Sequence, residues 1–137
     1  MQELMITRNP EYTLAEDVEN LIISKTYVSM VDIMNLAGDE GMGEGRMTIG
    51  DDNIVVWADM SEELVNVITS LRVNKSIHIH KADPLVYVMD GGWPNMPMVN
   101  RPPKNGYKHP HWLPVVFQPG FRCIDDRQCP NLGVSHG

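Results

Sequence analysis

The chain has 137 residues, of which 42% are hydrophobic and 21% are charged, a balance typical of one compact globular domain. No apolar run approaches the roughly 18 residues that a membrane span needs, and residues 1–10 lack the basic start and apolar core of a signal peptide. Five histidines and two cysteines are too few for a disulfide scaffold. We therefore expect a soluble, cytoplasmic protein with no membrane contact.

The formal net charge of −7 is distributed unevenly along the chain. Residues 1–70 contain three basic and fourteen acidic side chains, whereas residues 71–137 contain eight basic and four acidic ones. Such asymmetry indicates two surfaces with different partners, although an acidic surface can also serve solubility alone. A nucleic-acid contact is therefore expected in the second half.

Two helices are predicted in the first part of the chain. Thr13 and Glu16 fit the capping-box pattern, and apolar residues then recur at helical spacing, which predicts a helix over residues 13–24. Ser29 provides a second start signal, and Gly38 provides a C-terminal stop. A second, shorter helix is expected between them.

A loop, a strand and a third helix follow. Residues 38–50 hold five of the eleven glycines, so backbone entropy opposes both helix and strand, and a loop is expected there. The β-branched and aromatic run at residues 53–57 predicts a buried strand. Ser61 can cap a helix over residues 61–73, which has acidic residues in its first turn and basic residues near its end.

Residues 76–90 have the pattern of a β-hairpin. Apolar and polar residues alternate before a turn at residues 81–84, and a second apolar run returns over residues 85–89. The period of two predicts that the isoleucines face the core. It places His78 and His80 together on the opposite face.

The last third of the chain is rich in proline. Nine of the ten prolines lie within residues 84–130, where neither a helix nor a central strand is expected to persist. The segment has enough apolar residues to pack back on the domain or to cover a partner. Residues 111–117 are the best candidate for a further strand, and residues 122–137 are expected to fray.

The order of these elements resembles that of the winged-helix domain superfamily. The resemblance rests on the helix Ser61–Leu71 followed by the runs Ser76–His80 and Leu85–Val88, and it covers residues 13–91. It implies that residues 61–73 occupy the recognition-helix position and that the tip, Lys81–Pro84, is the wing. In such domains the recognition helix enters the major groove and the wing contacts the backbone or the minor groove.

These observations predict an α+β fold with a winged-helix-like core of three helices and a β-hairpin in residues 1–91. A proline-rich extended segment, residues 92–137, is expected to pack on this core, so that the whole chain forms one domain. We interpret the chain as a non-enzymatic regulatory protein that binds nucleic acid through helix 61–73, the hairpin tip and the basic loop 101–109. The candidate nucleic-acid-binding residues are Asn66, Thr69, Ser70, Arg72, Lys75, Lys81, Arg101, Lys104, Tyr107 and Lys108.

An alternative assigns the function to the acidic half. A small acidic protein can occupy a basic protein surface, as DNA-mimicking inhibitors do, and act as an inhibitor or adaptor on a nucleic-acid-handling complex. Exposed tryptophan or methionine surfaces could also form a homodimer. No signature of a catalytic nucleophile or of a metalloprotease is present, so no catalytic residue is assigned.

The histidines and cysteines could in principle form a zinc site. Zinc takes four nitrogen or sulfur ligands, but structural sites normally use closer cysteine pairs than the Cys-x5-Cys found here. The simpler interpretation is that these histidines lie on the surface or on an edge strand with their hydrogen bonds satisfied. We therefore expect neither a metal nor another cofactor. The residues that could take part in a site are His78, His80, His109, His111, Cys123 and Cys129.

Overall fold

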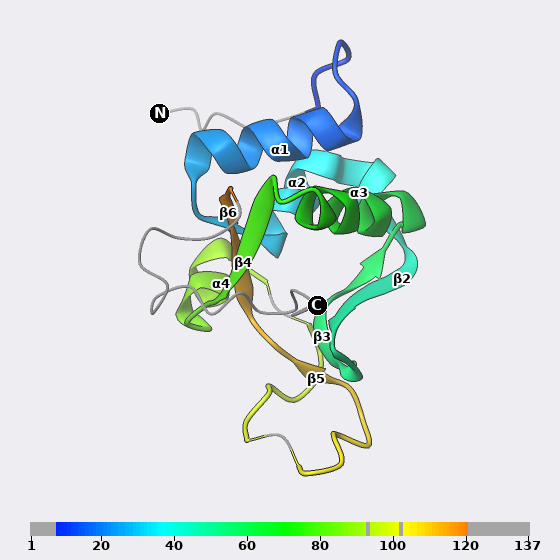
Figure 1. Ribbon diagram of the computed structural model, residues 1–137, viewed down its shortest axis with the longest axis vertical. Coiled ribbons are helices and arrows are strands. Elements are labelled where there is room, and N and C mark those ends of the chain that lie inside the picture. The colour runs from blue at the N-terminus through cyan, green and yellow to red at the C-terminus, as the bar shows by residue number, and fades with distance from the viewer. Residues whose placement is uncertain (1–7, 93, 102, 121–137) are drawn as a thin grey trace.

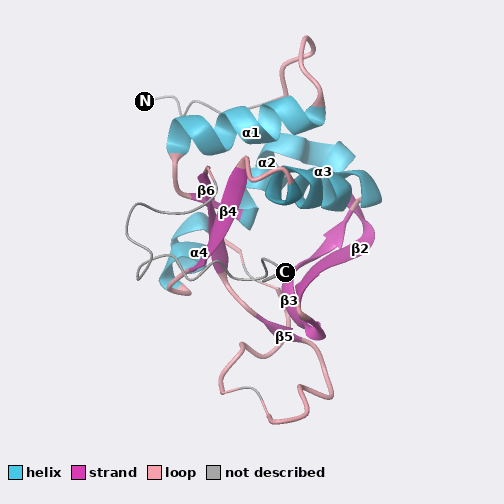
Figure 2. Cartoon of the chain, viewed as in Figure 1, coloured by secondary structure: helices cyan, strands magenta, loops and turns pink. Residues whose placement is uncertain are grey.

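The computed structural model describes residues 8–92, 94–101 and 103–120. Figures 1 and 2 show that this part combines helices with two small sheets, which confirms the α+β class. The elements in chain order are α1 (Leu14–Lys25), β1 (Val28–Ser29), α2 (Met30–Ala37), the 3-10 helix η1 (Gly38–Gly41), β2 (Met42–Ile49), β3 (Asp51–Met60), α3 (Glu62–Val73), β4 (Ile77–Lys81), α4 (Leu85–Asp90), β5 (His111–Trp112) and β6 (Val115–Pro119).

The first three helices begin where the capping residues predict. The Thr13 hydroxyl accepts a hydrogen bond from the Glu16 N–H at 3.1 Å, and the Glu16 carboxylate accepts one from the Thr13 N–H at 2.8 Å. Ser29 caps α2 in the same way, and Ser61 accepts from the third N–H of α3. Each side chain satisfies a backbone donor that the helix itself leaves unpaired, which fixes the starting residue.

The strands form two three-stranded sheets, with orders β1-β6-β4 and β2-β3-β5. In the first sheet β6 is central and antiparallel to both neighbours, so that Phe117 pairs with Val28 on one side and with Ile79 on the other. In the second sheet β5 runs parallel to β3, with Ile54 opposite His111. The prediction that no central strand persists in the proline-rich part is wrong, because no proline lies in β6 before its last residue, Pro119.

The predicted hairpin over residues 76–90 is only half correct. Its first half is strand β4, but residues 85–89 lie in helix α4, and β4 pairs with β6 instead. Pro84 provides a helical φ, and the Asp83 carboxylate accepts a hydrogen bond from the Leu85 N–H at 2.9 Å. Gly91 ends the helix with a φ of 92°. These local signals outweigh the strand preference of the apolar run.

The glycine-rich segment is also structured, contrary to the predicted loop. It forms η1 and the strand β2, which pairs with β3, and β3 extends well beyond the predicted residues 53–57. A Cβ at Gly43 would lie 2.7 Å from Cα of Ser61 and 2.8 Å from O of Met60. Glycine is therefore needed here because β2 passes directly against the start of α3, not because the chain is a loop.

The hydrophobic core joins the helices to both sheets, because its buried residues include Ile22 of α1, Phe117 of the first sheet and Val56 of the second. Helices α1, α2 and α3 form one layer at the top of Figure 1, and the hairpin β2-β3 descends from α3 toward β5. Tyr87 of α4 and Phe117 of β6 are the largest fully buried side chains. The predicted strand over residues 111–117 is present as two short strands, β5 and β6. Among the described helices, none has the length and apolarity that crossing a membrane would require.

Candidate nucleic-acid and ligand sites

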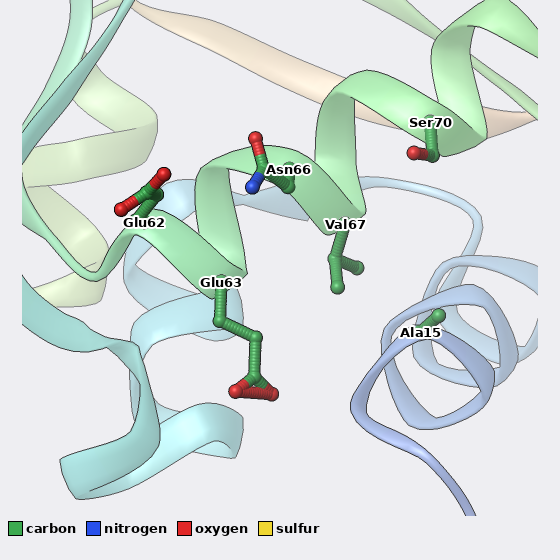
Figure 3. Close-up of a pocket in the computed structure, with 6 residues that line it drawn as sticks. All are labelled: Ala15, Glu62, Glu63, Asn66, Val67 and Ser70. Carbon is green, nitrogen blue, oxygen red and sulfur yellow. The ribbon is translucent and has the colours of Figure 1, made fainter.

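Helix α3 exposes a polar face that includes three of the candidate nucleic-acid-binding residues. Asn66, Thr69 and Ser70 are exposed, whereas the apolar stripe of the helix is buried. Beside this face lies an open groove of about 460 Å³, lined by Ala15 of α1 and by the α3 residues Glu62, Glu63, Asn66, Val67 and Ser70. In Figure 3, Glu63 and Val67 extend from α3 on the side of α1. Because its two charged lining residues are carboxylates, the groove repels phosphate and attracts cations.

The basic candidates near α3 have different surroundings. Arg72 lies in the last turn of α3 and is half-buried, and this burial lowers its pKa. Lys75 is exposed just beyond the helix, in a left-handed backbone conformation with a φ of 62°. Lys81 is exposed at the end of β4, but the segment after it leads into α4 and does not form the predicted hairpin tip. The predicted hairpin tip at residues 81–84 is therefore not formed, and it cannot serve as the expected contact to nucleic acid.

The basic loop 101–109 lies away from these residues. Arg101, Lys104 and Lys108 are exposed on it. The connection between α4 and β5, drawn in yellow in Figure 1, extends beyond β5 at the end of the molecule opposite α1. The structure therefore divides the candidate nucleic-acid-binding residues between α3 and this distant loop.

Tyr107 holds the basic loop closed. Its hydroxyl donates a hydrogen bond to the Asn100 carbonyl at 2.6 Å and accepts one from the Asn100 N–H at 2.8 Å. Its ring stacks on His111, with ring centres 3.7 Å apart and planes 17° apart. The Asn53 side chain of β3 donates to the Tyr107 carbonyl at 2.7 Å. One face of the Tyr107 ring is thus already covered, so that only the other face could stack on a base of a bound nucleic acid.

The hairpin β2-β3 supports the same loop. Besides the Asn53 contact, β3 pairs with β5, and the Val99 N–H donates to the Trp112 carbonyl at 2.7 Å. Asn53 is a residue that sequence reasoning missed. No local pattern could identify it, because its partner Tyr107 is brought near only by the parallel pairing of distant segments.

The two histidines of β4 are buried, whereas the alternation predicts an exposed face. His78 is 2% exposed and His80 is 5% exposed, and their Nε2 atoms lie 3.2 Å apart. The Nδ1 atom of His78 lies 2.9 Å from the Gly120 carbonyl oxygen. The isoleucines on the other face of β4 are also buried, so both faces of this edge strand are covered.

The six candidate zinc ligands separate into three groups. His78 and His80 lie together in the first sheet, whereas His111 belongs to the second sheet and His109 is exposed just before it. Cys123 and Cys129 lie outside the described residues. Within the described ranges, no group of three or more His, Cys, Asp or Glu side chains is placed to hold a metal ion.

An apolar surface surrounds α4. Leu85, Val88 and Met89 of this helix are 58%, 51% and 78% exposed. A pocket of about 250 Å³ beside the helix is lined by Pro84, Val88, Met96, Met98 and Trp112. This is the methionine-rich surface that the homodimer interpretation requires, although its tryptophan is itself buried.

Among the described residues of the acidic half, few form ion pairs. Arg8 contacts the carboxylates of Asp17 and Glu40, and the hydrogen bond to Glu40 raises the pKa of Arg8. Lys25 pairs with Asp32 at 2.6 Å. The carboxylates of Glu62 and Glu63 form no ion pair with any described residue, so the charge of the α3 groove is not neutralised there.

The geometry thus provides a carboxylate-lined groove at α3, a supported basic loop at the opposite end of the molecule and a buried histidine pair on β4. Comparison of the chain with protein-family models, with curated proteins and with solved structures finds no match to any of them.

Proposed function

We propose that this chain is a winged-helix-like, non-enzymatic regulatory protein that binds nucleic acid through the connection between β4 and β6. Three helices precede the antiparallel strands β4 and β6, and residues 82–114, which connect these strands, take the place of the wing. The wing is thus much longer than the turn at residues 81–84 that the sequence predicts. Its outer part is the basic loop 101–109.

The proposal rests mainly on the charge of the basic loop and of the residues on both sides of it. Residues 91–120 contain no aspartate or glutamate, and Arg101, Lys104 and Lys108 are all exposed there. Phosphate contacts from lysine and arginine supply most of the affinity of sequence-independent nucleic-acid binding. Since no neighbouring carboxylate in the loop competes for them, all three cations are available to phosphates.

The hydrogen bonds within the loop support the same role. The Tyr107–Asn100 hydrogen bonds tie residues near the two ends of the loop to each other, and the Asn53 contact ties Tyr107 to β3. A preorganised loop loses less conformational entropy on binding than a mobile one. Helix α3 contributes less in this proposal, because Glu62 and Glu63 at its start repel phosphates.

The test is binding of the purified chain to a mixed pool of duplex DNA, followed by fluorescence anisotropy at about 50 and 200 mM salt. Lys104→Glu together with Lys108→Glu is expected to weaken binding and to lower the salt slope by roughly two. Arg46→Glu, an exposed cation on β2, is the matched control and should leave the affinity unchanged. Absence of binding at the lower salt concentration contradicts the proposal, as does equal weakening by Arg46→Glu.

The carboxylate-lined groove favours a second candidate, a protein-binding inhibitor or adaptor. Glu62 and Glu63 line a groove of about 460 Å³ and would attract a basic peptide. A fluorescent lysine-rich peptide provides the probe. Glu62→Gln with Glu63→Gln should weaken its binding, whereas Lys104→Glu should not. If the peptide binds equally to the doubly substituted protein, the groove is not the site.

A further inference from the structure

A pocket of about 520 Å³ is lined by residues of α2, of the hairpin β2-β3 and of the segment that follows α4. Its volume falls within the roughly 300–1,000 Å³ that is typical of small-molecule sites. Three methionines and a tryptophan dominate the lining. Among the described residues that line the pocket, the polar ones are Asn35, Asp59 and Asn95. An apolar wall with a few polar groups is the usual composition of a ligand site.

A β-bulge shapes the side of the pocket that β3 forms. Ala58 and Asp59 of β3 lie opposite a single β2 residue, Arg46, and Asp59 has a left-handed backbone conformation with a φ of 57°. Aspartate adopts this conformation more readily than most residues do. In a regular strand successive side chains lie on opposite faces, whereas Trp57, Ala58 and Asp59 all line the pocket. Bulges of this kind redirect side chains and are frequent beside functional sites.

Asp59 gives the pocket a negative charge. Its side chain is exposed and forms no ion pair with any described residue. The described lining contains no lysine, arginine or histidine, and Arg46 on the neighbouring strand does not line the pocket. A carboxylate in this setting attracts a cation and can accept a charge-assisted hydrogen bond from it.

Trp57 and the methionines suit the apolar part of such a ligand. The Trp57 ring stacks on the buried ring of Tyr87, with ring centres 5.6 Å apart and planes 29° apart, so the core holds it in place at the wall of the pocket. Tryptophan is the aromatic side chain that most strongly attracts a cation over its face. Methionine side chains are unbranched and polarisable, and they adapt to ligands of irregular shape.

We propose that this pocket binds a small organic cation, an ammonium group carried on an apolar or aromatic body. Asp59 pairs with the ammonium group, and the apolar body packs against Trp57 and the three methionines, which are Met34, Met42 and Met96. A lysine side chain would fill only a small part of the pocket, so a free molecule fits it better than a peptide does. No candidate nucleic-acid-binding residue lines the pocket, so this site does not depend on nucleic-acid binding.

The first experiment compares three ligands on the isotope-labelled wild-type chain by nuclear magnetic resonance. Phenethylammonium, phenethyl alcohol and hydrocinnamate share a phenyl ring and a two-carbon linker, but they are positive, neutral and negative. Phenethylammonium should bind at least about tenfold more tightly than the alcohol, because a hydrogen bond to a charged group is worth more than a neutral one. Hydrocinnamate should bind most weakly.

The shifted amide signals show where the ligand binds. They are expected in α2, at residues 57–59 and at residues 94–96. Equal affinity for the ammonium ion and the alcohol overturns the proposal. So do shifts confined to the carboxylate-lined groove at α3, which would mean that the cation binds there instead. These outcomes do not depend on the folding of any variant.

The second experiment removes the charge at Asp59. Asp59→Asn should lower the affinity for phenethylammonium by about tenfold and leave the affinity for phenethyl alcohol unchanged. Asp52→Asn is the matched control, because Asp52 is an exposed residue of the same strand that does not line the pocket. Trp57→Phe should weaken binding of the ammonium ion more than binding of the alcohol. Equal affinity of the two asparagine variants for the ammonium ion contradicts the role of Asp59.

A short peptide with one lysine between glycines separates a free ligand from a lysine side chain. It should bind more weakly than phenethylammonium, because it leaves most of the pocket empty. Tighter binding of the peptide that Asp59→Asn abolishes overturns the assignment to a free molecule. Circular dichroism of each variant confirms that a lost affinity does not reflect a lost fold.

Discussion

The Tyr87 hydroxyl donates a hydrogen bond to the Val115 carbonyl at 2.5 Å and so joins helix α4 to the central strand β6. The same oxygen accepts a hydrogen bond from the Met30 N–H at 3.0 Å, at the start of α2. The Tyr87 ring is fully buried, stacks on Trp57 at 5.6 Å and meets Trp112 edge-on at 5.0 Å. One side chain therefore connects three elements that are far apart in the sequence.

Replacing Tyr87 by phenylalanine should destabilise the protein by about 1–3 kcal/mol, because a buried N–H and a buried carbonyl each lose a partner. Urea denaturation monitored by circular dichroism measures the change. Tyr12→Phe removes a hydroxyl from a side chain that is 44% exposed, and it should change the free energy of unfolding by less than about 0.5 kcal/mol. Equal effects of the two substitutions would contradict this role of Tyr87.

Tyr87 also predicts how stability depends on alkaline pH. Burial raises the pKa of Tyr87 above its ordinary value. The unfolded chain therefore releases the phenolic proton at lower pH than the folded chain does. The stability that the protonated, buried Tyr87 side chain contributes is fully present below the ordinary tyrosine pKa of about 10. It is lost as the pH rises from there through the higher pKa of the folded state.

The measurement is an ultraviolet titration of tyrosinate together with unfolding curves at each pH. Of the four tyrosines in the chain, Tyr87 should ionise only when the protein unfolds. The Tyr87→Phe protein should lose less stability above pH of about 10 than the wild type does. A chain in which all four tyrosines titrate before unfolding begins would disprove the prediction.

Gly43→Ala tests the close approach of β2 to the start of α3. The added methyl group would lie 2.7 Å from Cα of Ser61, and backbone atoms cannot move aside cheaply. Such overpacking is expected to lower the free energy of unfolding by about 1–3 kcal/mol. Gly92→Ala is the control, because its nearest neighbour, a Val31 methyl group, is 3.8 Å away. Thermal unfolding of both variants measures the difference, and a neutral Gly43→Ala would mean that β2 can move away from α3.

Ser61→Ala tests the N-cap of α3. Its hydroxyl accepts a hydrogen bond from the Leu64 N–H at 3.1 Å, and loss of such a cap typically costs about 1 kcal/mol. Ser70→Ala, at an exposed position within the same helix, should be neutral or slightly stabilising because alanine is the better helix former. Chemical denaturation of both proteins gives the comparison. If both substitutions have the same effect, the capping contact contributes nothing.

The helices could be predicted because their signals are local. Thr13, Ser29 and Ser61 each act on N–H groups within three residues, so the sequence contains the whole interaction. Helix α4 also has local signals in Pro84 and Gly91. The β-branched and aromatic run between these two residues favours a strand more strongly, because the periodicity of so short an apolar run is ambiguous.

Strand partners and the arrangement of the sites could not be predicted in the same way. Nothing near β4 indicates that Ile79 pairs with Phe117, because a chain connection of more than thirty residues separates the two strands. The charge asymmetry did indicate where exposed cations lie. It could not show that α3 and the basic loop occupy opposite ends of the molecule, which depends on the pairing of β3 with β5.

The central position of β6 has a consequence for synthesis on the ribosome. Within the described first sheet, β1 and β4 each pair only with β6, the last described strand to be translated. Helices α1 to α3 can form earlier from local signals, but their apolar faces lack this sheet until residue 119 has emerged. A nascent or prematurely terminated chain that ends before Val115 is therefore expected to expose apolar surface that chaperones and proteases recognise, and not to form a smaller stable domain.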